Sequence, residues 1–260
     1  MRILLALFIL LQPTLALAVD YTSDVNCQGA FLMEDDGNET DVAQGNTLTE
    51  TGGDIPQSAT KKFGTYSRDF ERGDGEYLTH ADGLSTDING ADQAISIVAF
   101  IKIETATINS YVVAKYLTTG NQRQYAFYYR DDASAMRFIL SPNGTNFSSA
   151  TGATNTDDGA WHGIAAVYND IDMRIYIGGS LDSNGANNPL TYSSGIADKS
   201  DIFRVGGFAD LTSMFDGLID DVAIFNRALT SVEVSDINTN GLVGSGEPPA
   251  VDNSQVIMIM

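Results

Sequence analysis

The sequence predicts an all-β sandwich of two antiparallel sheets, followed by one short helix near the C-terminus. Short segments of alternating apolar residues recur along the chain, with Gly, Asn and Asp turn signals between them. No long helical period is present before residue 230. The stretch 215–225 is largely apolar on both faces, as expected for a strand that is covered on two sides.

Residues 1–18 have the features of a secretory signal peptide. Arg2 supplies a positive charge, residues 3–11 form an apolar core, and Ala16 and Ala18 fit a small-x-small cleavage site. The apolar run is too short to span a membrane. We therefore expect cleavage after Ala18 and a secreted, extracellular protein without membrane insertion. The remaining chain has the length of one large β domain.

The predicted strands follow one another with short turns. Residues 94–103 alternate, so that one side of the strand carries Ile95, Ile97, Ala99, Ile101 and Ile103. Further strands are predicted over 111–116, 124–130, 136–140, 161–168, 173–177, 202–206 and 214–225. Asn169-Asp170 and Gly178-Gly179 are tight-turn signals that indicate hairpins.

The last of these strands carries two adjacent acids in an apolar setting. Simple alternation places Leu218, Asp220, Val222 and Ile224 on one face, and Ile219, Asp221, Ala223 and Phe225 on the other. Acids in a buried strand are costly unless they are hydrogen-bonded or bound to a cation. Thr230 and Glu233 then have the spacing of a capping box, which predicts the short helix. Residues 244–260 form a tail whose apolar end, 255–260, could pair as an edge strand.

The charge of the chain excludes two classes of partner. The formal net charge is −20, which repels nucleic acid and anionic membranes. Such a surface either serves solubility or favours cations. Cys27 is the only cysteine, so we expect a free buried thiol, with intermolecular pairing as the alternative.

Six blocks, in order, resemble a LamG-like jelly-roll domain of the concanavalin A-like lectin/glucanase superfamily (laminin G/pentraxin-like). They are 31–41, 62–78, 95–102 (with Phe100 where the family usually has Trp), Trp161-His162, 174–181 and the closing segment 215–233. The resemblance implies a jelly-roll β-sandwich over residues 19–243. It says little about the ligand, because one fold hosts many functions.

The resemblance also implies a structural Ca²⁺. Jelly rolls of this group often bind one Ca²⁺ that joins the opening turn to the closing strand. Carried onto this chain, the ligands are Glu34, Gly37, Gly73 and Asp220, with the glycines acting through their carbonyl oxygens. Hard oxygen ligands of this kind suit Ca²⁺. The alternative is that the carboxylates cap turns and accept backbone N–H bonds.

We predict no catalytic residues. The laminarinase-like enzymes of this fold take their two carboxyls from a Glu-x-Asp-x-(x-)Glu strand, and this chain has no such run. Glu71 and Glu76 lack a matching partner in the sequence, and His162 follows Trp161 in a motif that is usually structural. A carboxylate pair contributed by separate strands stays open as the alternative.

Sugar binding is the remaining class of site. If Tyr125, Phe127 and Tyr129 face the core, Tyr128 and Arg130 are exposed on the sheet. The loop 141–147 is rich in polar residues, and its Asn143 and Asn146 could read sugar hydroxyls.

We therefore expect a non-catalytic module that binds a glycan or another cell-surface ligand, with Tyr128, Arg130, Asn143 and Asn146 as binding residues. The alternatives are a structural or adhesive module of an envelope or virion and a glycan-cleaving enzyme.

Overall fold

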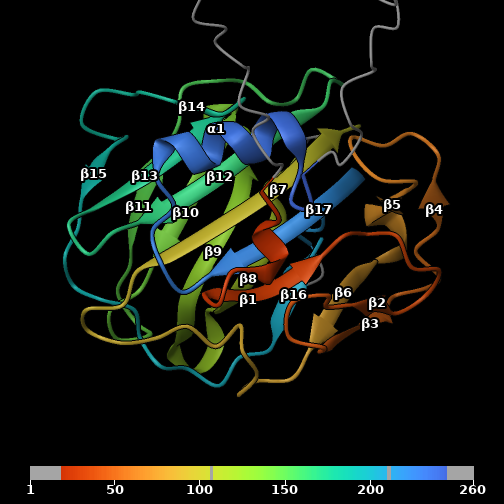
Figure 1. Ribbon diagram of the computed structural model, residues 1–260. Coiled ribbons are helices and arrows are strands. Elements are labelled where there is room, and N and C mark those ends of the chain that lie inside the picture. Colours follow the sequence, from red (N-terminus) through yellow and green to blue (C-terminus); the bar gives the residue numbers. More distant parts are fainter. Residues whose placement is uncertain (1–18, 106–107, 210–211, 245–260) are drawn as a thin grey trace, which may run out of the picture.

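The computed structural model describes residues 19–105, 108–209 and 212–244. The predicted architecture is confirmed: two antiparallel sheets pack face to face, and one helix lies near the C-terminus (Figure 1). The predicted signal peptide and nearly all of the tail lie outside the described residues. Within the described ranges, no helix is long and apolar enough to cross a bilayer.

The first sheet has nine strands and contains the closing strand β17 near its middle. Its order is β14-β13-β12-β7-β17-β5-β4, with β1 paired to β17 and β15 paired to β13. The strands are β1 (Cys27–Phe31), β4 (Gln57–Ser58), β5 (Ser67–Phe70), β7 (Ile95–Ile103), β12 (His162–Tyr168), β13 (Asp172–Ile177), β14 (Ser180–Leu181), β15 (Leu190–Thr191) and β17 (Gly217–Phe225).

The second sheet has eight strands in the order β11-β10-β9-β8-β16-β6-β3-β2. They are β2 (Glu39–Thr40), β3 (Thr47–Thr51), β6 (Tyr77–His80), β8 (Ser110–Leu117), β9 (Gln122–Arg130), β10 (Ala135–Leu140), β11 (Ser148–Thr151) and β16 (Phe203–Val205). Short 3₁₀ turns lie at η1 (Tyr21–Ser23), η2 (Arg72–Asp74), η3 (Thr119–Asn121) and η4 (Asp131–Ala133).

The main core lies between the two sheets and forms from the alternation that the sequence predicts. All the predicted inward residues of β7 belong to it, as do Tyr125, Phe127 and Tyr129 of β9 on the opposite sheet. Each side chain of this set is at most 2 % exposed. Because apolar burial is the dominant favourable term in folding, this layer holds the domain together without a disulfide. Cys27 is free and buried, as expected.

The closing strand β17 departs from simple alternation. Its pairing with β7 shifts register after Asp220, and Asp221 takes a left-handed backbone with φ 44°. This bulge puts Ile219 in the same core layer as Val222 and Ile224. The predicted grouping of Asp220 with Val222 and Ile224 on one face is therefore wrong, because the bulge changes the face along the strand. Val222 and Ile224 are fully buried, as predicted.

Helix α1 (Ser231–Asn240) covers the outer face of the nine-stranded sheet, where it contacts β12 and β14 (Figure 1). The predicted capping box is present: Thr230 Oγ1 accepts from the Glu233 N–H, and Glu233 accepts from the Thr230 N–H at 2.7 Å. Arg227 ties this turn to the start of the domain, because it pairs with both Glu233 and Asp24. The helix is thus anchored at its first turn.

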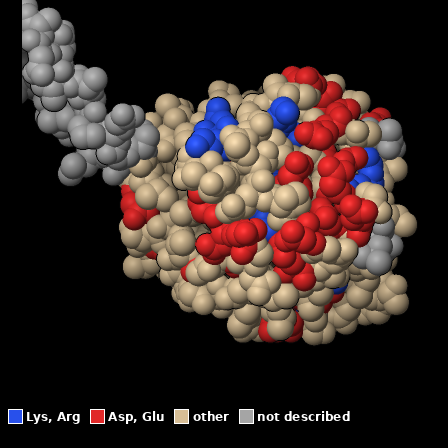
Figure 2. Space-filling model, turned by 90° about the vertical axis from the view of Figure 1, so that its right-hand side faces the viewer, with Lys and Arg blue, Asp and Glu red and all other residues tan. Residues whose placement is uncertain are grey.

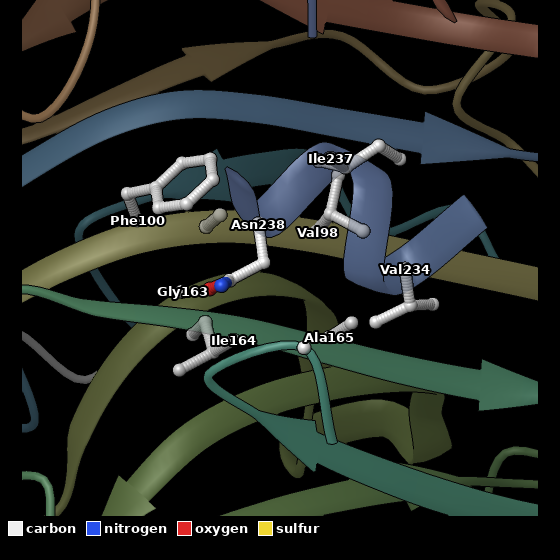
Figure 3. A pocket seen from close by; sticks show the side chains of 10 residues that line it. Val98, Phe100, Gly163, Ile164, Ala165, Val234, Ile237 and Asn238 are labelled. Carbon is white, nitrogen blue, oxygen red and sulfur yellow. The ribbon is translucent and has the colours of Figure 1, made fainter. Parts of the chain in front are cut away.

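The seam beneath α1 is too narrow to be a ligand site. Figure 3 shows Val234 and Ile237 of the helix against the sheet, with Asn238 beside Gly163. The free space there is about 10 Å³, roughly what one water needs. A Cβ on Gly163 would lie 2.3 Å from Asn238 Oδ1, so glycine permits this close approach. We interpret the seam as a packing contact.

Candidate functional site

The opening turn is built around a buried arginine. Arg68 is fully buried, and its guanidinium donates to the carbonyl oxygens of Asp35 (2.8 Å) and Gly37 (2.7 Å). The same group pairs with Glu50 and lies 3.8 Å from Glu39. The Gly37 carbonyl, predicted as a metal ligand, is therefore occupied by a cation that the chain itself supplies.

Two of the predicted metal ligands, Glu34 and Asp220, converge on the loop between β4 and β5. Asp220 Oδ2 accepts from the backbone N–H groups of Lys62 (2.8 Å) and Phe63 (3.0 Å). Glu34 Oε1 accepts from the N–H of Thr65 at 2.6 Å. These contacts agree with the alternative to a metal site, in which the carboxylates accept hydrogen bonds from backbone N–H groups. However, Asp220 is fully buried and its Oδ1 has no hydrogen-bond partner among the described residues.

Asp221 adds a third carboxylate to this place, which simple alternation did not predict. The bulge directs it to the outer face, where it accepts from the Leu242 N–H at 3.3 Å. Burial, followed by the charge of Asp220, raises the pKa of Asp221 to about 8, and burial raises the pKa of Asp220 to about 6. A cavity of about 230 Å³ adjoins Glu34 and Asp221, and its lining also includes Leu32, Phe63, Asn240 and Val243.

Gly73 does not join this group. It lies in η2, which follows the far end of β5 from the loop that holds Glu34 and Asp220. Its neighbour Arg72 pairs with Asp216 there. The structure thus brings together Glu34 and Asp220 of the predicted set, binds the Gly37 carbonyl to Arg68, and leaves Gly73 at the far end of β5.

The outer face of the eight-stranded sheet carries a row of aromatic and basic side chains. Tyr111, Tyr128 and Arg137 are directly paired across β8, β9 and β10. Tyr111 stacks on Tyr128 with ring centres 4.4 Å apart, and Phe208 stacks on Tyr111 at 4.5 Å. Tyr128 is therefore only 3 % exposed. Our expectation that it is exposed is wrong, because aromatic neighbours on the same face cover it.

Arg130 is placed as predicted, at the partly exposed end of β9. It pairs with Asp132 in the turn that follows. Arg130 and Arg137 line one polar hollow of about 520 Å³, together with Asn109 and Asp131. The hollow is open to solvent-borne ligands and falls in the size range of small-molecule sites.

The loop 141–147 closes the other end of this face. Asn143 Oδ1 accepts from the N–H groups of Thr145 (2.9 Å) and Asn146 (2.8 Å), so it shapes the turn. Both Asn143 and Asn146 are exposed. Arg123 donates to the Thr145 carbonyl at 2.8 Å and thereby fixes the loop to β9.

Phe147, at the end of this loop, is a surface residue that the sequence analysis did not select. Its ring is 45 % exposed, and the Arg137 guanidinium lies 5.9 Å from the ring centre. Tyr116 approaches the same ring edge-on at 6.5 Å. The sequence signal for this residue was a single phenylalanine at the end of an otherwise polar loop, which could have indicated an exposed aromatic ring. We use the term Arg137 face for Arg123, Arg130, Arg137, Asn143, Asn146 and Phe147.

A family model described as the concanavalin A-like lectin/glucanases superfamily matches residues 72–235. The chain belongs to this superfamily. The sequence prediction of the family is therefore confirmed. No curated protein matches the chain.

Solved structures share the superfamily fold at low identity. Domain 4 of AbnA, an extracellular arabinanase from Geobacillus stearothermophilus, is 18% identical with a TM-score of 0.59, covering 82% of this chain and 98% of that one. The botulinum neurotoxin serotype G binding domain is 15% identical with a TM-score of 0.62, over 82% and 51%. Trypanosoma rangeli sialidase is 13% identical with a TM-score of 0.56, over 85% and 34%. The chain thus spans about half of the toxin domain, and these likenesses establish the fold alone.

The superfamily includes glucanases, and the described residues of this chain contain a second group of carboxylates. Oxygens of Asp69 on β5, of Glu71 just after β5 and of Glu104 just after β7 lie within 4.8 Å of one another. Figure 2 faces the side that carries β4 and β5 in Figure 1, and acidic side chains gather on it. Partial burial, then the charge of Glu104, raises the pKa of Asp69. The sequence analysis did not predict this group, because Glu104 is distant from Asp69 and Glu71 along the chain.

The histidines have structural partners. The ring of His80 is buried, and its two nitrogens form hydrogen bonds with the Ala81 carbonyl (2.7 Å) and with Thr86 Oγ1 (2.8 Å). His162 Nε2 contacts Asp158 Oδ1 at 2.9 Å in the turn before β12. This arrangement matches the structural role that we expected for His162.

Proposed function

We propose that the protein is an exported, non-catalytic module that binds glycans through the Arg137 face. The observation that carries the proposal is the exposed ring of Phe147 beside the guanidinium of Arg137, a residue that also lines a polar hollow. An aromatic ring offers an apolar surface to the C–H face of a sugar. Guanidinium and amide groups around it supply directed hydrogen bonds to hydroxyls.

The fold relatives support this class of ligand. The arabinanase domain was solved in complex with arabinotriose, and a botulinum neurotoxin DC binding domain was solved in complex with SialylT. Cell entry of botulinum neurotoxin type C depends on interaction with two ganglioside molecules. These statements concern those proteins, and they motivate a glycan as the first ligand to test here.

A glycan-array screen of the mature protein tests the proposal. Phe147→Ala should abolish the signals, because it removes the exposed ring and leaves the sheet intact. Tyr66→Ala is the matched control, since Tyr66 is an aromatic residue of similar exposure (37 %) outside this face. Array signals that survive Phe147→Ala would contradict the proposed site. A protein without signal on any glycan would favour the structural or adhesive alternative.

We also propose a structural Ca²⁺ between the opening turn and the closing strand, held by Glu34 and Asp220 and without Gly37 or Gly73. The acids are hard oxygen donors, and Asp220 Oδ1 is buried without a partner among the described residues. Bound Ca²⁺ would supply positive charge that compensates the buried carboxylates. It would also link the loop before β5 to the closing strand.

Glycan cleavage is the second candidate, and one observation favours it. The carboxylates of Asp69, Glu71 and Glu104 are close enough for a glycosidase pair, for which roughly 5–10 Å separates the two groups. Incubation with a panel of polysaccharides tests this candidate. Release of reducing sugar that Glu71→Gln abolishes would replace the binding proposal with an enzymatic one; no release is the expected result.

Export is tested on secreted material. The proposed signal peptide ends at Ala18, so intact-mass analysis should give a chain that begins at Val19. Exported protein that retains Met1 would contradict the proposed cleavage.

A further inference from the structure

The arginines of the protein divide into two groups by their partners. Most have a carboxylate within ion-pair distance, as expected for a chain with a formal net charge of −20. The arginines with such a partner are Arg68, Arg72, Arg130, Arg174, Arg204 and Arg227. Arg123 and Arg137 have no such partner in the described part of the chain, and both belong to the Arg137 face.

The contacts of these two arginines are with neutral groups. Arg123 bonds to the Tyr116 hydroxyl at 3.1 Å and lies 5.8 Å from the centre of that ring. Arg137 donates to Ser149 Oγ at 2.7 Å and lies beside the ring of Phe147. Arg137 Nε has no hydrogen-bond partner in the described chain. An aromatic ring lies beside each guanidinium group, and no carboxylate of the described residues lies within ion-pair distance of either.

The other charged groups of the hollow define where an anion could bind. Asp132 neutralises Arg130, and Asp131 lies on the same turn, so this end of the hollow does not attract an anion. Arg137 is on β10, beside the exposed ring of Phe147. The negative charge elsewhere on the surface is largely screened beyond about 10 Å at 0.1 M salt. An anionic group can therefore reach Arg137 at ordinary ionic strength.

We infer that the Arg137 face selects glycans that carry an anionic group, a carboxylate or a sulfate, which Arg137 binds while Phe147 contacts the sugar ring. A guanidinium suits this role because its planar fork matches a carboxylate, and hydrogen bonds between charged groups are stronger than neutral ones. Arg123 acts as a positioning residue, since it fixes the loop that carries Phe147. This inference rests on the proposed function and adds the chemical class of the ligand.

The experiment compares matched polymers by calorimetry or biolayer interferometry. Polygalacturonate is paired with its methyl ester, and dextran sulfate with dextran, so that the carboxylate and sulfate sources are separated. The wild-type protein should bind at least one anionic member and bind its neutral counterpart about tenfold more weakly or worse. Arg137→Gln should weaken binding of that anionic member by about tenfold or more, as expected on losing a hydrogen bond to a charged group.

Arg174→Gln is the matched control, because Arg174 lies on the other sheet. It should leave binding unchanged, and Arg137→Lys, which keeps the charge, should recover part of the affinity. The melting temperature of each variant checks its folding. Equal binding of charged and neutral members, or an equal loss in Arg174→Gln, would overturn the inference and leave glycan binding standing. If the protein bound none of these polymers and no glycan on the array, both the inference and the proposed glycan binding would be overturned.

Discussion

The calcium proposal gives a sharp prediction for Asp220→Asn. In the wild type, Asp220 Oδ2 accepts two backbone N–H bonds while Oδ1 is buried without a partner in the described structure. An asparagine keeps an acceptor for the two N–H groups and removes the charge that a cation requires. The variant should therefore fold, and it should lose the response to Ca²⁺.

The expected size of that response follows from linkage. Ca²⁺ at a hundredfold excess over its Kd stabilises the folded state by about 2.7 kcal/mol. For a domain of this size, that raises the melting temperature by about 5–11 °C. In chelator the variant should melt at the wild-type temperature or above it, because a buried amide costs less than a buried charge.

Differential scanning fluorimetry with Ca²⁺, Mg²⁺ and chelator measures these shifts. Glu104→Gln is the matched control, since Glu104 belongs to the other acidic group. The reasoning would be refuted if Asp220→Asn kept the full Ca²⁺ shift, or if Mg²⁺ gave the same shift as Ca²⁺. A shift that disappears in Glu104→Gln alone would place the ion at the Asp69 group.

Three further predictions concern stability. Ile224→Ala should cost about 2–5 kcal/mol by denaturant unfolding, because the side chain is fully buried; a loss under about 0.5 kcal/mol would contradict its core position. Burial lowers the pKa of His80 below its usual 6.5, although the hydrogen bond to the Ala81 carbonyl and the charge of Asp41 oppose this. The folded state therefore disfavours the charged ring, and stability falls as the pH drops below 6.5. His80→Gln should reduce that loss between about pH 7.5 and pH 5 relative to the wild type, and equal losses would show that another group is responsible. Gly163→Ala should destabilise by about 1–3 kcal/mol, and Asn238→Ala in the same chain should restore part of it; no cost would mean that the seam is loose.

The strands could be predicted because their signals are local. Alternation along 94–103 and the turn residues at Asn169-Asp170 fix which residues face inward and where the hairpin β12–β13 closes. The capping box at Thr230 is likewise contained within four residues. The closing strand was predicted, but its bulge was not, because the left-handed backbone at Asp221 coincides with a register shift against β7, which is distant along the chain.

The site was harder to predict because it depends on contacts between distant segments. Alternation along β9 predicts that Tyr128 is exposed. Instead, it is buried in an aromatic stack with Tyr111 and Phe208, which come from other parts of the chain. Gly37 has a carbonyl in the opening turn, but the buried Arg68 occupies it. Neither contact leaves a periodic signal in the sequence.

The central claim is that glycans bind at the Arg137 face. The most direct test is an NMR titration of ¹⁵N-labelled mature protein with an oligosaccharide selected on the array. The account predicts saturable shifts centred on the backbone amides of residues 141–149 and on those beside Arg130 and Arg137. Shifts centred instead on α1, or on the loop between β4 and β5, would contradict it.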